Sequence, residues 1–373
     1  MKIWIPFAAA GAILLGAAML TGAGWDTPPV DTDQIGYRGT GMYVTHDRED
    51  VAALRAANAL PEPQYEPDTT GDRAKDVYEN VQILGDLSAD QFNQFMASIT
   101  EWVAPEQGCN YCHNEENLAS DEVYTKVVAR RMIQMTQTVN TDWQAHVGNV
   151  GVTCYTCHRG QPVPNNVWWR DNGPKAAGGA LGYRDGQNVV GKFVGNTSMP
   201  TDALEAYLVE ANNIRVHSTQ ALPDRTNTTT TKETERTWAL MLHMSESLGV
   251  NCVTCHNSRA FNDWDQSPPQ RVTAWHGIRM ARQLNVNYLT GLAPVFPDNR
   301  KGPEGDVFKV GCGTCHQGVQ KPLYGQTMLQ EYLDSLGKKT NVEVPDYSKY
   351  KAGETKVMSE NALTPATRVA ASQ

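Results

Sequence analysis

The sequence predicts a mainly α-helical fold with few short strands and long irregular segments, organised as two related halves. Three observations lead to this prediction. Apolar residues recur at helical spacing in four stretches of the chain. Each of these stretches is followed by a short turn and one copy of a cysteine-containing pentapeptide. The segments between them are rich in Gly, Pro and Asn, which interrupt regular elements.

The N-terminal residues 1–25 predict a retained membrane-spanning helix. Lys2 precedes an apolar stretch of about 20 residues, which is long enough to cross a bilayer. Trp4 and Trp25 flank this stretch, as expected of aromatic anchors at the two interfaces of a membrane. A cleaved signal peptide, which has a shorter apolar core, is the alternative. In both cases the remainder of the chain is exported.

Composition shifts divide the rest of the chain into five segments. They are an extended N-terminal arm (26–85), a first half (86–160), a connecting segment (161–230), a second half (231–336) and a C-terminal extension (337–373).

Two amphipathic helices are predicted in each half. In the first half, Ser88-x-x-Gln91 forms a capping box before one helix, and the other starts near Asp121. In the second half, Thr230-x-x-Glu233 and Ser267-x-x-Gln270 predict the two helix starts. The dipeptide 279–280 (Arg-Met) of the last helix echoes the dipeptide 131–132 of the second, which favours an internal duplication.

All eight cysteines fall in four copies of Cys-x-x-Cys-His, which is the attachment signature of c-type haem. The spacing suits that chemistry, because two thiols add to the two vinyl groups of one haem and the adjacent imidazole reaches the iron. Two zinc sites would leave the four histidines unexplained, and a thioredoxin-like dithiol would be a single motif. The sequence therefore predicts four covalently attached c-type haems. The copies are Cys109–Cys112–His113, Cys154–Cys157–His158, Cys252–Cys255–His256 and Cys312–Cys315–His316.

The charge balance bears on the partners. With 32 basic and 41 acidic residues the formal net charge is −9, which argues against a nucleic-acid partner. An acidic surface could instead attract a basic soluble protein.

Methionines upstream of the motifs are candidates for the sixth iron ligands, because Met or His completes the coordination of electron-transfer haems. Met96 precedes the first motif, Met132 and Met135 precede the second, and Met241 and Met244 precede the third. Residues three apart share a helix face, so each close pair stays open. For the fourth motif the candidates are Met280, His146, His217 and His276.

The four motifs, their uneven spacing and the upstream methionines resemble the tetrahaem cytochrome subunit of bacterial photosynthetic reaction centres over roughly residues 25–335. The resemblance implies the pairs Met96–His113, Met132–His158, Met241–His256 and His146–His316. Met135, Met244 and Met280 then become core residues. Members of the family carry a lipidated cysteine after the signal peptide. This chain has none, so a transmembrane helix takes that role in the prediction.

The resemblance also implies the function. The chain would lie at the periplasmic face of the photosynthetic inner membrane and take electrons from a soluble donor, either a small cytochrome c or a high-potential iron–sulfur protein. It would re-reduce the photooxidised bacteriochlorophyll pair carried by the reaction centre core subunits. The third haem would lie nearest that pair, followed by the fourth, second and first. The chain would not be an enzyme. The alternatives are a multihaem enzyme, which needs an open iron position, and a general exported electron carrier.

Overall fold

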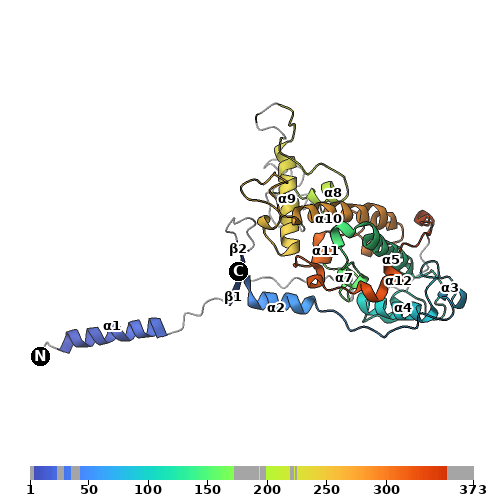
Figure 1. Ribbon diagram of the computed structural model, residues 1–373, viewed down its shortest axis with the longest axis horizontal. Coiled ribbons are helices and arrows are strands. Elements are labelled where there is room, and N and C mark those ends of the chain that lie inside the picture. Colours follow the sequence, from blue (N-terminus) through green and yellow to red (C-terminus); the bar gives the residue numbers. More distant parts are fainter. Residues whose placement is uncertain are drawn as a thin grey trace. The chain divides into compact units, whose positions relative to one another are not determined.

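The computed structural model describes residues 4–22, 29–34, 43–171, 193, 199–218, 222 and 225–350. The chain divides into two compact units, residues 1–57 and 58–373. The division into six segments stays a prediction. Within the described residues the fold is mainly helical with one two-stranded sheet, as the sequence predicts (Figure 1).

The first unit contains helix α1 (Trp4–Gly22), a hairpin and helix α2 (Arg48–Ala57). The hairpin pairs β1 (Val30–Gln34) antiparallel with β2 (Tyr43–Asp47). Among the described residues, no helix combines the length and apolar character that crossing a membrane requires. The transmembrane anchor predicted over residues 1–25 is therefore not supported.

Four longer helices organise the second unit, and they correspond to the four amphipathic stretches (Figure 1). They are α4 (Ala89–Val103), α5 (Tyr124–Asp142), α9 (Thr231–Leu248) and α10 (Gln270–Leu284). Short helices connect them: α3 (Ala74–Val77), α6 (Gln144–Val147), α7 (Cys154–His158), α8 (Ala203–Leu208), α11 (Cys312–His316) and α12 (Leu333–Leu336).

Two of the three predicted capping boxes form. Ser88 and Thr230 both form the predicted capping boxes of α4 and α9. Helix α10 begins at Gln270 as predicted, but the predicted Ser267 cap is wrong, because its N-cap is Pro269 and has no side-chain cap bond. The Ser267 hydroxyl instead donates to the carbonyl oxygen of Asp263 and accepts from Arg271.

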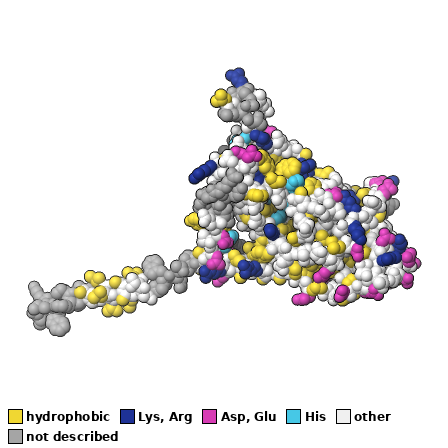
Figure 2. Space-filling model, viewed as in Figure 1, with side chains coloured by type: hydrophobic (Ala, Val, Ile, Leu, Met, Phe, Trp, Pro, Cys, Tyr) yellow, Lys and Arg dark blue, Asp and Glu magenta, His cyan; other side chains and the backbone are white. Residues whose placement is uncertain are grey.

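The apolar core consists of separate clusters rather than one continuous interior. One cluster joins α4 to residues 328–336, with Phe95 and Trp102 packed against Tyr332 and Leu336. A second joins α8, α9 and α10, and a third joins α5 to α10 and the residues that follow it. On the face in Figure 2, acidic side chains gather toward the edges, while apolar side chains surround the histidines in the middle.

Candidate functional site

Each cysteine motif folds into a single helical turn. The second and fourth motifs form α7 and α11, and each ends in a left-handed residue with φ of 49°, Arg159 and Gln317 respectively. The first and third lie in the 3-10 turns η2 (Gly108–Tyr111) and η4 (Cys252–Thr254). Residues three and four apart share a helix face, so one turn presents both thiols and the imidazole on the same side.

All four motif histidines place Nδ1 against a backbone carbonyl oxygen. The acceptors are Leu118 for His113 (3.0 Å), Gln161 for His158 (2.8 Å), Phe261 for His256 (2.8 Å) and Val319 for His316 (3.0 Å). Such a bond fixes the ring orientation and the tautomer with the proton on Nδ1, which leaves Nε2 as a metal ligand. The acceptor lies five residues on in the first and third motifs and three residues on in the second and fourth.

Burial shifts the pKa of the motif imidazoles toward the neutral form that binds metals. It lowers the pKa of His316 to about 4 and also lowers the pKa of His158 and His256, so that the imidazoles stay neutral. Burial raises the thiol pKa of Cys112 to about 11 and that of Cys154 to about 12. The thiols are therefore protonated at neutral pH.

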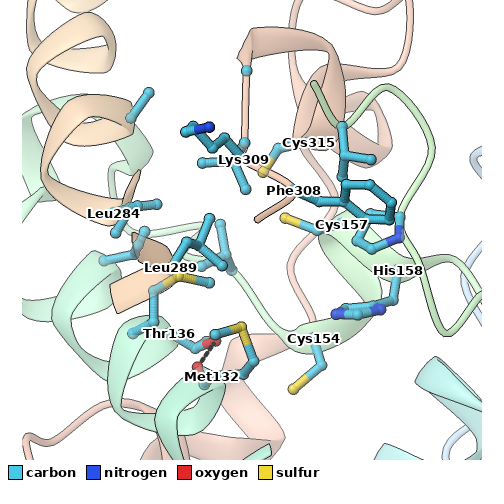
Figure 3. A pocket seen from close by; sticks show the side chains of 18 of the residues that line it. Met132, Thr136, Cys154, Cys157, His158, Leu284, Leu289, Phe308, Lys309 and Cys315 are labelled. Atoms are coloured by element: carbon cyan, nitrogen blue, oxygen red, sulfur yellow. Dashed lines mark hydrogen bonds between the residues drawn. The ribbon is translucent and has the colours of Figure 1, made fainter. Parts of the chain in front are cut away.

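A largely apolar cavity lies between α5, α10 and the second and fourth motifs. Figure 3 shows Met132 on α5 across this cavity from His158, with Cys154 and Cys157 between them. Met135 and Met280 line the same cavity and pack against the cluster that joins α5 and α10. A flat group held by the two thiols would therefore have an imidazole on one side and a thioether within reach on the other.

His146 of α6 lies beside the fourth motif although it precedes the second in sequence. Its ring centroid is 6.1 Å from that of His316, with 66° between the ring planes. Two imidazoles bound to one iron from opposite sides place their centroids about 6 Å apart, given metal–nitrogen bonds of about 2 Å. The His146 Nδ1 meets the carbonyl oxygen of Thr273 at 2.9 Å, which again leaves Nε2 as the ligating atom.

The other candidate ligands have different surroundings. His276 packs edge-on to Trp275, and among the described residues His146 alone has a ring contact with His316. Met96 is partly buried against the cluster around Trp102. Met241 and Met244 both pack against the cluster that joins α8, α9 and α10. Met244, unlike Met241, also lines the cavity at the second and fourth motifs.

Contacts between the motifs give them a spatial order that differs from their sequence order. Cys112 of the first motif lines the same cavity as His158 of the second. The thiols of Cys157 and Cys315 lie beside each other, which joins the second motif to the fourth (Figure 3). The backbone of Gly318, just after the fourth motif, donates to Ser247 (2.9 Å) near the end of α9, which leads into the third. These contacts place the fourth motif between the second and the third, and the first motif lines the cavity that the second and fourth share.

Two buried asparagines hold the second and fourth motifs in the same way. Asn140 donates from Nδ2 to the carbonyl oxygens of Val152 and Leu336 and accepts from the Val152 backbone N–H. Asn285 donates to Val310 and Leu208 and accepts from the Val310 N–H. Each valine lies two residues before the first cysteine of its motif.

This shared pattern aligns α5 with α10 at an offset of 145 residues. Between residues 125–140 and 270–285, five of the 16 aligned positions are then identical: Val127 and Val272, Ala129 and Ala274, Ile133 and Ile278, Met135 and Met280, Asn140 and Asn285. Met280 therefore corresponds to Met135. The dipeptide echo predicted from sequence, which matches Met280 to Met132, is wrong by three residues, because residues at that spacing share a helix face and look alike in an apolar pattern.

Arg300 is a candidate site residue that the sequence analysis missed. It is 7% exposed, it lines the cavity, and its guanidinium donates to the Tyr111 hydroxyl at 2.7 Å. Among the described residues, no carboxylate lies within 4.0 Å of this buried cation. No sequence motif marks it, because its burial arises from the packing of the loop before the fourth motif against the first.

The chain was compared with known proteins. The family model described as photosynthetic reaction centre cytochrome C subunit matches residues 26–335. A photosynthetic reaction center cytochrome c subunit from Rubrivivax gelatinosus is 51% identical over 316 residues, which cover 85% of this chain and 86% of that protein. The subunit from Thermochromatium tepidum is 48% identical over 320 residues, covering 86% and 78%. Cytochrome c-554 from Chloroflexus aurantiacus is 27% identical over 293 residues, covering 65% and 69%.

Proposed function

Because the chain belongs to the family of photosynthetic reaction centre cytochrome c subunits, we propose that it carries electrons from a soluble donor to the photooxidised bacteriochlorophyll pair. Membership of the family makes it an electron-transfer subunit of the reaction centre rather than an enzyme, and it implies covalently bound haem. The number of haems, their ligands, the donor and the periplasmic location are parts of the proposal.

The residues of the four motifs fit four c-type haems. Each motif presents two thiols and one imidazole from a single turn, and each imidazole has its Nδ1 occupied by a carbonyl oxygen. The proposed axial pairs are Met96–His113, Met132–His158, Met241–His256 and His146–His316. Bound haem iron supplies one-electron chemistry, with a potential set by the axial ligands, burial and nearby charge. A thioether ligand raises this potential and a second imidazole lowers it.

The protein's own residues then position and tune these groups. Carbonyl oxygens hold the imidazoles in one orientation, and apolar side chains exclude water from the cavity around His158 and His316. Arg300 is placed to pair with a haem carboxylate, because its charge is buried, faces the cavity and meets the neutral hydroxyls of Tyr111 and Tyr124 rather than a carboxylate among the described residues. Its positive charge would favour the reduced state of the neighbouring site.

The spatial order of the motifs is the observation that carries the proposal. The second and fourth motifs touch through Cys157 and Cys315, and the fourth is bonded to the end of α9 through Gly318. The first motif lines the cavity of the second and fourth, which supports one path in the order first, second, fourth, third. Electron transfer over such a path needs only closely spaced sites. We place the end at the third motif next to the bacteriochlorophyll pair and the end at the first motif next to the soluble donor.

The proposed architecture is two related dihaem halves. The matched asparagine–valine contacts and the matched histidine–carbonyl spacings support this duplication. The acidic net charge of −9 suits a basic soluble donor, either a small cytochrome c or a high-potential iron–sulfur protein.

Flash spectroscopy on washed native membranes tests the proposal. The flash oxidises the bacteriochlorophyll pair, and the haem α-band is followed with time. Haem oxidation that matches the recovery of the pair, and that persists without soluble cytochrome, is the expected result. Recovery of the pair without haem bleaching would overturn the assignment. Intact-mass measurement of the purified chain should show four added haems, and a smaller number would overturn the tetrahaem reading.

A further inference from the structure

Gly277 lies in the interior of α10, where glycine destabilises a helix by about 1 kcal/mol relative to alanine. The environment explains this choice. A Cβ atom built at Gly277 would lie 2.5 Å from Cε1 and 2.9 Å from Nδ1 of His146. Both distances are shorter than any non-bonded contact that can be tolerated. The ring of His146 therefore lies directly on the helix backbone, and only glycine leaves room for it there.

The same helix also holds the ring in place. The carbonyl oxygen of Thr273, one turn before Gly277, meets the His146 Nδ1 at 2.9 Å. This carbonyl is also the i−4 acceptor expected for the Gly277 N–H. Helix α10 therefore supplies an acceptor and a gap one turn apart, and together they orient His146 toward His316.

The alignment of the two halves shows what the gap replaces. At the offset set by Asn140 and Asn285, Gly277 corresponds to Met132. Met132 faces His158 across the cavity in the first half (Figure 3). In the second half the equivalent side chain is missing, and the His146 ring occupies the space that it would fill.

We propose that Gly277 is a positioning residue that selects the sixth ligand of the fourth haem. By removing the side chain at the position of Met132, it admits His146 from the other half and converts a Met/His site into a His/His site. This inference rests on the proposed axial pairs. It makes the ligand difference between the second and fourth haems the result of one position in a duplicated helix.

The test uses the full-length holocytochrome with three variants, each checked for its haem number by intact mass. Gly277→Ala adds one methyl group against the His146 ring. Gly291→Ala is the matched control, because no atom lies within 4 Å of its built Cβ. His146→Ala removes the proposed ligand. The readouts are the low-spin electron paramagnetic resonance signals, carbon monoxide binding by the reduced protein, and the redox titration of each haem.

Gly277→Ala should convert one haem of four from low spin to high spin, or shift the midpoint potential of that haem alone, and should bind up to one equivalent of carbon monoxide. Gly291→Ala should leave all four haems unchanged. His146→Ala should affect the same haem as Gly277→Ala, and the double variant should show no further change, because the glycine acts only through the histidine.

The outcomes distinguish the role of His146 as a ligand from the role of Gly277 in positioning it. If His146→Ala changes one haem and Gly277→Ala changes none, the axial pairs stand and the positioning role of Gly277 is wrong. If His146→Ala changes no haem, the proposed ligand itself is wrong. Gly277→Met gives an independent measurement that does not depend on loss of ligation. A new thioether-to-ferric-iron absorption band and a raised potential at the fourth haem are expected, and an unchanged His/His spectrum would contradict the correspondence with Met132.

Discussion

Asn285 offers the sharpest test of how the structure holds the fourth motif. Its side chain is fully buried and makes three hydrogen bonds with the backbone. Nδ2 donates to the carbonyl oxygens of Leu208 and Val310, at 3.0 Å each, and Oδ1 accepts from the Val310 N–H at 2.8 Å. These bonds tie α8 and the end of α10 to the segment that enters Cys312.

Replacing Asn285 with alanine removes all three bonds. The Leu208 carbonyl and the Val310 N–H then lose this partner, whereas the Val310 carbonyl still accepts from the Trp168 indole N–H. A buried group that loses its partner costs about 1–1.5 kcal/mol at the lower end of measured values, so the free energy of unfolding should fall by about 2–3 kcal/mol. With an unfolding entropy of about 2.1 cal/mol/K per residue over the second unit, this corresponds to a Tm lower by about 3–5 °C.

Thermal unfolding of the holocytochrome, followed by far-ultraviolet circular dichroism, measures this effect. Asn299→Ala is the matched control, because Asn299 is exposed and its loss should change the Tm by less than about 1 °C. The fourth haem should also titrate at a shifted potential, since its attachment segment loses support. A Tm for Asn285→Ala within about 2 °C of wild type would refute the reasoning that these bonds anchor the motif.

Three further outcomes are expected. Ser88→Ala removes the N-cap of α4 and should lower the free energy of unfolding by about 1 kcal/mol, measured by denaturant titration with the Gln91 half of the capping box intact. The pKa of Asp121 is affected first by burial, which raises it, but hydrogen bonding and charge from Arg130 bring the net pKa below its usual value. The stability from this pair is therefore present at neutral pH and declines as the pH falls through the lowered pKa. Asp121→Asn should lose less free energy of unfolding than wild type between pH about 6 and 3. The same dependence of stability on pH in both proteins would contradict the pairing. Arg300→Leu should lower the midpoint potential of the adjacent haem in a redox titration, whereas Arg300→Lys, which keeps the positive charge, should leave that potential close to the wild-type value. Equal potentials in wild type and Arg300→Leu would exclude a nearby haem carboxylate.

The sequence predicts most of the local structure correctly. The capping boxes at Ser88 and Thr230 form because a hydroxyl and a carboxyl or amide three residues on satisfy neighbouring backbone groups without help from distant residues. The exception is Ser267, whose hydroxyl finds a partner in the loop before it. The apolar stripe of each long helix was also recognisable, but its register against the other half was not, because positions three apart are equivalent in such a pattern.

The charged residues around the candidate site show the same contrast between local sequence pattern and tertiary contacts. The arginines of α5 have structural partners: Arg130 pairs with Asp121, and Arg131 donates to the carbonyl oxygen of Asn287. Arg300, which no pattern marks, is a buried cation that lines the cavity and, unlike Lys309 with its Asp306 partner, has no carboxylate within 4.0 Å among the described residues. A cationic side chain that is near a motif in sequence often faces solvent. A cationic side chain becomes buried without a carboxylate partner only where distant segments pack over it, which the sequence does not mark.

The sequence by itself determined the chemistry of attachment. Cys-x-x-Cys-His brings two thiols and an imidazole onto one turn wherever a helical turn forms, and this requires no information from the rest of the chain. Only the tertiary structure decided how the turns are arranged. Contacts between segments far apart in the sequence place the fourth motif between the second and third and bring His146 onto Gly277 and beside His316. Such contacts depend on the packing of helices against one another, which local sequence spacing does not encode.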